Sequence, residues 1–233
     1  MSDLITRPWP FLLNTLSAGL QAAHAYERKY PALAANPNSK SRFTLPGSTP
    51  GSEAERAAFF VAGSATGAIW EVILRHSAPD ATGGVYVAPG ALVGWSIAFL
   101  DLLQDIPNVL RVDRPHRLRF VEADSLGDDT WNTLCATPVH ALTHGAAHEV
   151  NRFMDSHDVV HAGLGWRSRQ WPDDVVYVLY APPLTDGIWR HKSSVDLDSP
   201  EGLELVKKAV TDAGYHWNEP PADAPVSGEV PDA

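Results

Sequence analysis

The stretch "AAFFVAGSATGAIWEVILRH", residues 57–76, predicts a strand followed directly by a helix. The apolar run at 57–62 has the length of a buried strand. Ser64 or Thr66 can cap the helix by accepting hydrogen bonds from the free N–H groups of its first turn. Glu71 lies inside this helix between two apolar residues. Its carboxylate either faces solvent or belongs to an active site.

The composition is that of a globular protein with no general attraction for anions. The chain has 233 residues, and 44% of them are hydrophobic, which is enough for a substantial core. Its 28 acidic residues outnumber 18 basic ones and give a formal net charge of -10. We therefore expect neither nucleic acid nor a membrane as a partner. An anionic ligand would require a local basic cluster.

The sequence gives no sign of export. Asn14 and Ser17 interrupt the first apolar segment, which therefore lacks the apolar centre of a signal peptide. No run approaches the roughly 18 apolar residues of a membrane-spanning helix. The single cysteine, Cys135, excludes an intrachain disulfide and fits a reducing compartment. We expect a cytoplasmic protein.

Outside the opening stretch, the sequence predicts a mixture of helices and strands. Helices are expected where apolar residues recur at helical spacing or form a long run, at residues 10–34, 91–104 and 138–155. Strands are expected at the shorter apolar or alternating segments 83–89 and 116–124, and in a hairpin of 158–169 with 174–182. This order predicts the α+β class, with helices packed on a mixed sheet.

Glu71 has an ordinary explanation as well as a functional one. At four-residue spacing, Gly67, Glu71 and Arg75 lie along one line of the helix surface. A solvated pair of Glu71 with Arg75 explains this line without any function. A functional carboxylate is the alternative.

Three histidines also share one helix face, because His140, His144 and His148 repeat every four residues. Two such imidazoles can bind zinc, but the glutamate that follows the first histidine in zinc proteases is missing. No third ligand is evident, so we expect no metal and interpret this face as polar or partly packed.

In "GLGWRSRQW", residues 163–171, strand alternation places Trp166 and Ser168 on one face and two arginines on the other. This pattern places a hydroxyl beside an aromatic surface with guanidinium groups close by, as in a functional site; the alternative is an ordinary hairpin strand with solvated arginines. The sequence around Ser168 is not the nucleophile elbow of α/β-hydrolases, and no glycine-rich dinucleotide loop or phosphate-binding loop occurs.

Taken in order, three segments resemble the RES domain family, which is named for an Arg, a Glu and a Ser. They are "SRFTLPGS" (41–48), "FFVAGSATGAIWEVILRH" (59–76), and "GLGWRSRQW" (163–171) followed by "VVYVLY". In that family an arginine loop precedes a strand, a helix with the glutamate follows directly, and the serine comes much later in another strand. The matching positions are Arg42, Glu71 and Ser168, within residues 40–182.

The resemblance implies a split mixed sheet like that of ADP-ribosyltransferases, and NAD as the substrate. Cleavage of the nicotinamide–ribose bond passes through an oxocarbenium-like state, which a fixed carboxylate stabilises. By this resemblance Glu71 holds the ribose and the developing charge, and Arg42 holds a phosphate oxygen. Ser168 makes a hydrogen bond near the nicotinamide ribose.

One position departs from the family pattern. Where the family has Tyr in a Y-x-A strand end, this sequence has Phe60 in "FVA". Tyr86 is a candidate substitute for the lost hydroxyl. Phe60, Tyr86 or Trp166 can provide an apolar wall against a ring of the dinucleotide.

We expect three regions: an N-terminal helical extension at 1–39, a catalytic domain at 40–185 by the resemblance, and a C-terminal extension at 186–233. The tail from 214 is too poor in apolar residues to pack, so we expect it to be disordered. The resemblance also implies a toxin that is neutralised by a helical antitoxin. The acceptor in the reaction stays open between water, phosphate and a protein side chain. Two alternatives are a non-catalytic RES-like binding module and a helix-rich interaction protein whose motif match is accidental.

Overall fold

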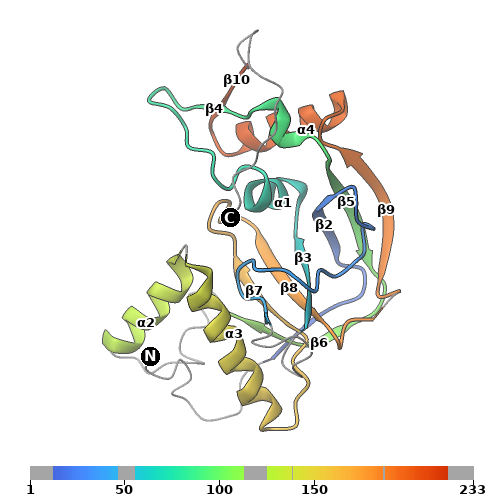
Figure 1. Cartoon of the computed structure of the whole chain (residues 1–233), viewed down its shortest axis with the longest axis vertical. Coiled ribbons are helices and arrows are strands. Elements are labelled where there is room, and N and C mark those ends of the chain that lie inside the picture. Colours follow the sequence, from blue (N-terminus) through green and yellow to red (C-terminus); the bar gives the residue numbers. More distant parts are fainter. Residues whose placement is uncertain (1–12, 47–55, 113–124, 138, 186, 220–233) are drawn as a thin grey trace.

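Strands from the whole length of the chain form one eight-stranded sheet (Figure 1). The computed structural model describes residues 13–46, 56–112, 125–137, 139–185 and 187–219. The strand order is β1-β6-β7-β8-β3-β2-β5-β9, and β10 and β4 form a separate two-stranded sheet. The strands are β1 (Asn14–Leu16), β2 (Gln21–Glu27), β3 (Ala57–Ala62), β4 (Gly84–Tyr86), β5 (Trp95–Leu102), β6 (Ile106–Arg111), β7 (Gly163–Arg167), β8 (Val175–Ala181), β9 (Trp189–Asp196) and β10 (His216–Asn218). The helices are α1 (Ala65–Val72), the 3-10 helix η1 (Pro89–Leu92), α2 (Ser125–Ala136), α3 (His140–Asp155) and α4 (Pro200–Asp212).

Both faces of the large sheet are apolar. The four α-helices contribute to one cluster of buried residues, which covers one face. A second cluster fills the other face and contains Leu16 of β1 and Trp189 of β9, the two edge strands. The sheet therefore curls until its two edges share a core. The α+β class predicted from the sequence is confirmed.

Several elements predicted from the sequence are confirmed, beginning with those of the opening stretch. Residues 57–62 form β3, and Ser64 caps α1 by accepting a hydrogen bond of 3.0 Å from the N–H of Gly67. The predicted helix at 138–155 is α3. The predicted hairpin is the antiparallel pair β7–β8. The predicted strand at 83–89 is β4, although it pairs with β10 rather than with the large sheet.

Two predicted helices are wrong. Residues 10–34 contain strands β1 and β2, and residues 91–104 contain the end of η1 and strand β5. In β2 and β5, alternate residues enter the two opposite apolar clusters. A strand that is buried on both faces shows no polar alternation, so its apolar run imitates a buried helix.

Both predicted extensions contribute to the same fold. Strands β1, β2 and β9 belong to the large sheet. The expectation of disorder from 214 is wrong for residues 216–218, which form β10 and place Trp217 against the core. The strand predicted at 116–124 and the tail from 220 lie outside the described residues.

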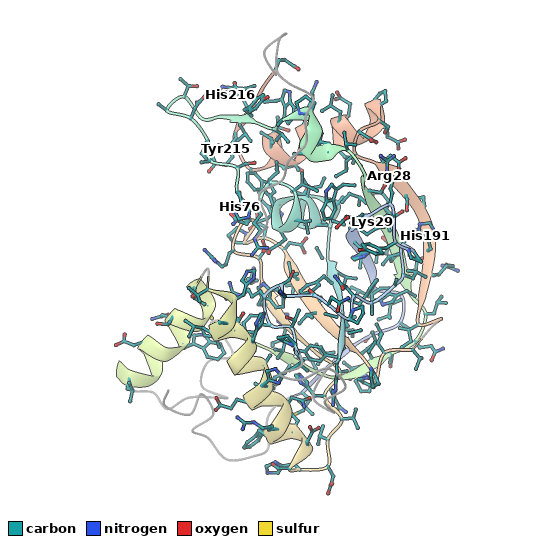
Figure 2. All side chains as sticks on the ribbon, viewed as in Figure 1. Arg28, Lys29, His76, His191, Tyr215 and His216 are labelled. Atoms are coloured by element: carbon teal, nitrogen blue, oxygen red, sulfur yellow. The ribbon has the colours of Figure 1, made fainter. Side chains whose placement is uncertain are left out.

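Ion pairs also join the segment after β2 to the segment between β9 and α4. Arg28, which is labelled in Figure 2 and follows β2, pairs with Asp196 at 2.7 Å and with Asp198. These carboxylates lie at the end of β9 and just before α4, so segments about 170 residues apart in the sequence meet there. None of the helices in the described ranges is long and apolar enough to cross a membrane.

Helix α4 is tied to α1 by a buried hydrogen bond of 2.9 Å from the indole N–H of Trp70 to the carbonyl of Ala209. Substituting Trp70→Phe removes this donor and leaves a buried acceptor unpaired. We expect the free energy of unfolding to fall by about 1–3 kcal/mol, measured by urea titration.

Trp217→Phe is the matched control, because the indole N–H of Trp217 has no hydrogen-bond partner among the described residues. This control should lose clearly less stability. Equal losses in the two variants would show that the α1–α4 hydrogen bond contributes nothing of its own.

Candidate functional site

Glu71 lies where α1 meets the turn between β7 and β8. It is half-buried, and its Oε1 accepts a hydrogen bond of 3.1 Å from the backbone N–H of Arg169. Within the described residues no ion pair joins Glu71 to Arg75, whose guanidinium instead contacts His140. Glu71 and Arg75 therefore have other partners than the solvated pair that the helical spacing suggested. The line of Gly67, Glu71 and Arg75 faces other parts of the protein.

The loop that carries Arg42 is held on α3 by the histidines noted in the sequence. His140 Nδ1 donates to the carbonyl of Lys40 at 2.9 Å, and His144 Nε2 to that of Ser41 at 2.9 Å. His148 Nε2 donates to the carbonyl of Pro46 at 3.1 Å. Among the described residues, no group of three His, Cys, Asp or Glu side chains is arranged to hold a metal ion. The histidine face therefore serves to dock the loop.

His140 also connects this loop to α1. Its Nε2 contacts the guanidinium of Arg75, which can only donate, so the ring is neutral with its proton on Nδ1. Burial, followed by the positive charge of Arg75, lowers the pKa of His140. A neutral ring suits both contacts, because a protonated Nε2 would have no lone pair to offer the guanidinium.

Phe43 adopts a left-handed backbone conformation, with φ of 57°. A bulky residue rarely has a positive φ, and such positions persist only when surrounding contacts enforce them. Here the N–H of Phe43 donates to Thr143 Oγ1 at 3.2 Å, and its carbonyl accepts from the hydroxyl of Tyr180 at 2.8 Å. Both partners are fully buried. The conformation of the loop is thus fixed from two sides.

The guanidinium of Arg42 is buried, and no ion pair joins it to another described residue. The side chain is 9% exposed, lies over the ring of Phe43 at 5.0 Å, and donates from Nη2 to the carbonyls of Leu134 at 2.5 Å and Cys135 at 2.8 Å. These carbonyls belong to the last turn of α2, where the helix dipole favours a cation. Nε and Nη1 of Arg42 have no hydrogen-bond partner among the described residues. Buried donors of this kind are rare and call for an acceptor.

Three guanidinium groups meet between the last turn of α2 and the first residue of α3; we call Arg42, Arg75 and Arg169 the arginine cluster. Arg169 donates from Nη1 to the carbonyl of Thr137 at 3.1 Å, and Arg75 reaches His140. Burial, followed by the charge of Arg169, lowers the pKa of Arg42 from 12.5 to about 10, while Glu71 is among the groups that offset this shift. Arg42 stays protonated at neutral pH. The protein is acidic overall, yet this cluster provides the local positive charge that an anionic ligand requires.

Ser168 lies beside this cluster, but its hydroxyl is used inside the protein. It is 2% exposed, and its Oγ accepts from the backbone N–H groups of Gln170 at 3.2 Å and Trp171 at 2.8 Å. These bonds shape the turn whose Arg169 N–H binds Glu71. The structure therefore brings Arg42, Glu71 and Ser168 together, and it favours a structural role for the serine over direct contact with a ligand.

Of the predicted apolar wall, two members lie together. Trp166 is 5% exposed and packs edge-on against Phe60, with ring centroids 6.5 Å apart, and against Phe43 at 5.0 Å. Phe60 is more exposed than Trp166. Tyr86 is 42% exposed on β4, in the two-stranded sheet, and no contact among the described residues joins it to the arginine cluster.

Sequence reasoning did not identify Arg169 and Thr143 as part of this site. Arg169 was placed on the strand face opposite Ser168, because nothing in its neighbourhood indicates that β7 ends two residues earlier, at Arg167. Thr143 lies between two of the repeating histidines, and its inward position follows from the same helical spacing. A separate apolar cavity of about 450 Å³ lies between η1, the start of α4 and β10, and contains none of the predicted site residues.

The fold is similar to that of a chain in the crystal structure of the M. tuberculosis MbcT–MbcA toxin–antitoxin complex. The TM-score is 0.56 at 18% sequence identity, and the match covers 82% of this chain and 91% of that chain. At this identity the similarity establishes a shared fold. No protein-family model matches the sequence, and no curated protein is significantly similar to it.

The enforced conformation of Phe43 can be tested through Thr143. Replacing Thr143 by Val keeps its shape but leaves the N–H of Phe43 without its acceptor. We expect the free energy of unfolding to fall by about 1–3 kcal/mol in urea titrations. Thr143→Ser retains the hydroxyl and should lose less. A valine variant as stable as the serine variant would argue against this hydrogen bond.

Proposed function

We propose that this protein is an NAD-consuming enzyme of the RES type that cleaves the bond between nicotinamide and ribose. The observation that carries the proposal is the buried guanidinium of Arg42, two of whose nitrogens have no partner among the described residues, next to a half-buried carboxylate. NAD combines the matching groups, a diphosphate and a ribose that becomes positively charged as nicotinamide leaves. The fold shared with a chain of a toxin–antitoxin complex agrees with the three matched motifs.

In this proposal Arg42 binds a phosphate oxygen through Nε and Nη1, the two nitrogens that find no partner among the described residues. A planar guanidinium fork suits a phosphate better than a point charge does. Arg75 and Arg169 add positive charge nearby and partly neutralise the second phosphate. Because these side chains are already anchored to backbone carbonyls or to His140, little ordering is needed when the ligand binds.

Glu71 acts on the ribose. Its Oε1 is held by the N–H of Arg169, and among the described residues no hydrogen bond engages Oε2. A carboxylate fixed in this way stabilises the oxocarbenium-like state without having to reorganise. Phe60 and Trp166 supply an apolar wall, and Ser168 maintains the turn that orients Glu71. Water, phosphate or a protein side chain completes the reaction by bonding to the ribose carbon.

We further propose that the protein is the toxin of a toxin–antitoxin pair, with a helical protein as its antitoxin. This follows from the RES resemblance and the fold shared with a chain of such a complex. The alternative is a non-catalytic module that binds NAD or a partner without turnover. Phe60, which lacks the family's hydroxyl, and the buried position of Ser168 favour that alternative.

Nicotinamide release from NAD tests the enzymatic proposal. Purified protein should release nicotinamide, measured by chromatography, and Glu71→Gln should lower kcat by roughly 100-fold, because the carboxylate charge is lost while its size is kept. Glu204→Gln, the same change on exposed α4, should retain full activity. The second product separates the acceptors, because water gives ADP-ribose and phosphate gives its phosphorylated form.

Circular dichroism must show that all three proteins are folded. NAD binding without release above the Glu71→Gln level would favour the non-catalytic module. Neither binding nor release would reject the proposed function altogether.

A further inference from the structure

Asp174, at the end of the turn between β7 and β8, has a buried carboxylate that reaches the start of α1. It is 9% exposed. Its Oδ2 accepts from both the backbone N–H of Ser64 at 2.8 Å and the hydroxyl of Ser64 at 2.7 Å. Its Oδ1 accepts from the N–H of Val175 at 2.7 Å. One carboxylate therefore connects the first residue of β8 to the residue that caps α1.

Two glycines leave room for this carboxylate. A Cβ built on Gly63 would lie 2.4 Å from Oδ1 of Asp174, and one built on Gly67 would lie 2.0 Å from Oδ2. Both distances are far inside van der Waals contact. The backbone on either side of Ser64 thus packs directly on the carboxylate, which fixes where α1 begins.

The backbone of Asp174 fixes the turn as well. Its carbonyl accepts from the N–H of Ser168 at 3.0 Å, and its N–H donates to the carbonyl of Trp171 at 3.0 Å. Between these two residues lies Arg169, whose N–H binds Glu71. Asp174 is consequently bonded both to the start of the helix that carries Glu71 and to the turn that orients it.

We propose that Asp174 is a positioning residue for Glu71, an inference that rests on the proposed NAD-cleaving function. Glu71 lies one helical turn beyond Gly67, the residue packed against the carboxylate. A shift of α1 relative to the turn would separate Glu71 from the N–H of Arg169 and move the carboxylate away from the ribose. Asp174 itself touches no substrate. The loop of Arg42 is held by α3 and does not depend on Asp174.

The test is Asp174→Asn, which keeps the shape of the side chain but offers one acceptor oxygen in place of two. Displacing a catalytic group by a fraction of an ångström lowers kcat, and we expect a loss of at least about tenfold. KM for NAD should change less than kcat, because Arg42 is untouched and only Arg169 of the arginine cluster lies in the turn that Asp174 holds. Asp173→Asn, the same change on the exposed neighbour, should leave both constants unchanged.

A double variant separates positioning from a general loss of folded protein. In a Glu71→Gln background, Asp174→Asn should cause no further loss of nicotinamide release, because the group that it positions is already disabled. Hydrogen exchange of the Arg169 amide should accelerate in Asp174→Asn, while the amides of α4 keep their protection. If Asp174→Asn does not fold, Ser64→Ala takes its place, with Ser64→Thr as the control that retains the hydroxyl.

Unchanged kcat in folded Asp174→Asn, or further loss in the Glu71→Gln background, would overturn the inference while leaving the NAD-cleaving function intact. Absence of nicotinamide release from the wild-type protein would instead overturn the proposed function, and the catalytic role of Asp174 with it. A loss of kcat of about tenfold or more that exceeds the change in KM, and that is absent from the double variant, supports the inference.

Discussion

The burial of the Arg42 guanidinium is the constraint on which the site depends. Placing a cation away from water is costly unless its donors are satisfied, and here only Nη2 is bonded within the described residues. The structure offsets this cost with carbonyls at the end of α2 and with the ring of Phe43. Phe43 in turn has a left-handed backbone that two buried hydroxyls hold in place. Among the described residues no carboxylate forms an ion pair with this guanidinium, and that observation is the basis for proposing an anionic ligand here.

The second half of the site is built separately and meets the first at Glu71. Helix α1 and the β7–β8 turn are joined through Asp174, and the turn presents its Arg169 N–H to the carboxylate. The loop of Arg42 depends on α3, whose histidines bind its carbonyls. The two halves also touch where His140 of α3 contacts Arg75, just after α1. Under the proposed function, substitution of Arg42 should act mainly on KM for NAD, and substitution of Glu71 or Asp174 mainly on kcat.

Features set by neighbouring residues were predictable from the sequence. The strand at 57–62, its cap at Ser64 and helix α3 were all predicted correctly, because local spacing determines them. Strands β2 and β5 were mistaken for helices, since burial on both faces removes the alternation that identifies a strand. The eight-stranded sheet also contradicts the helix-rich architecture considered from the sequence.

For the site, the order of motifs selected Arg42, Glu71 and Ser168, which the fold brings together. The contacts of these residues could not be predicted from the sequence, because the contacts join residues about a hundred positions apart. An example is the contact of Arg42 with the end of α2. The histidine spacing showed that three rings share a helix face, but only the fold shows that this face binds the Arg42 loop. Tyr86 remains a prediction without a described contact to the site.

The most direct test of the central claim is a crystal structure of the Glu71→Gln protein with NAD bound. The account predicts a diphosphate oxygen within hydrogen-bonding distance of Nε or Nη1 of Arg42, and the nicotinamide ribose beside residue 71. NAD bound elsewhere, with both Arg42 donors satisfied by the protein or by water, would contradict it.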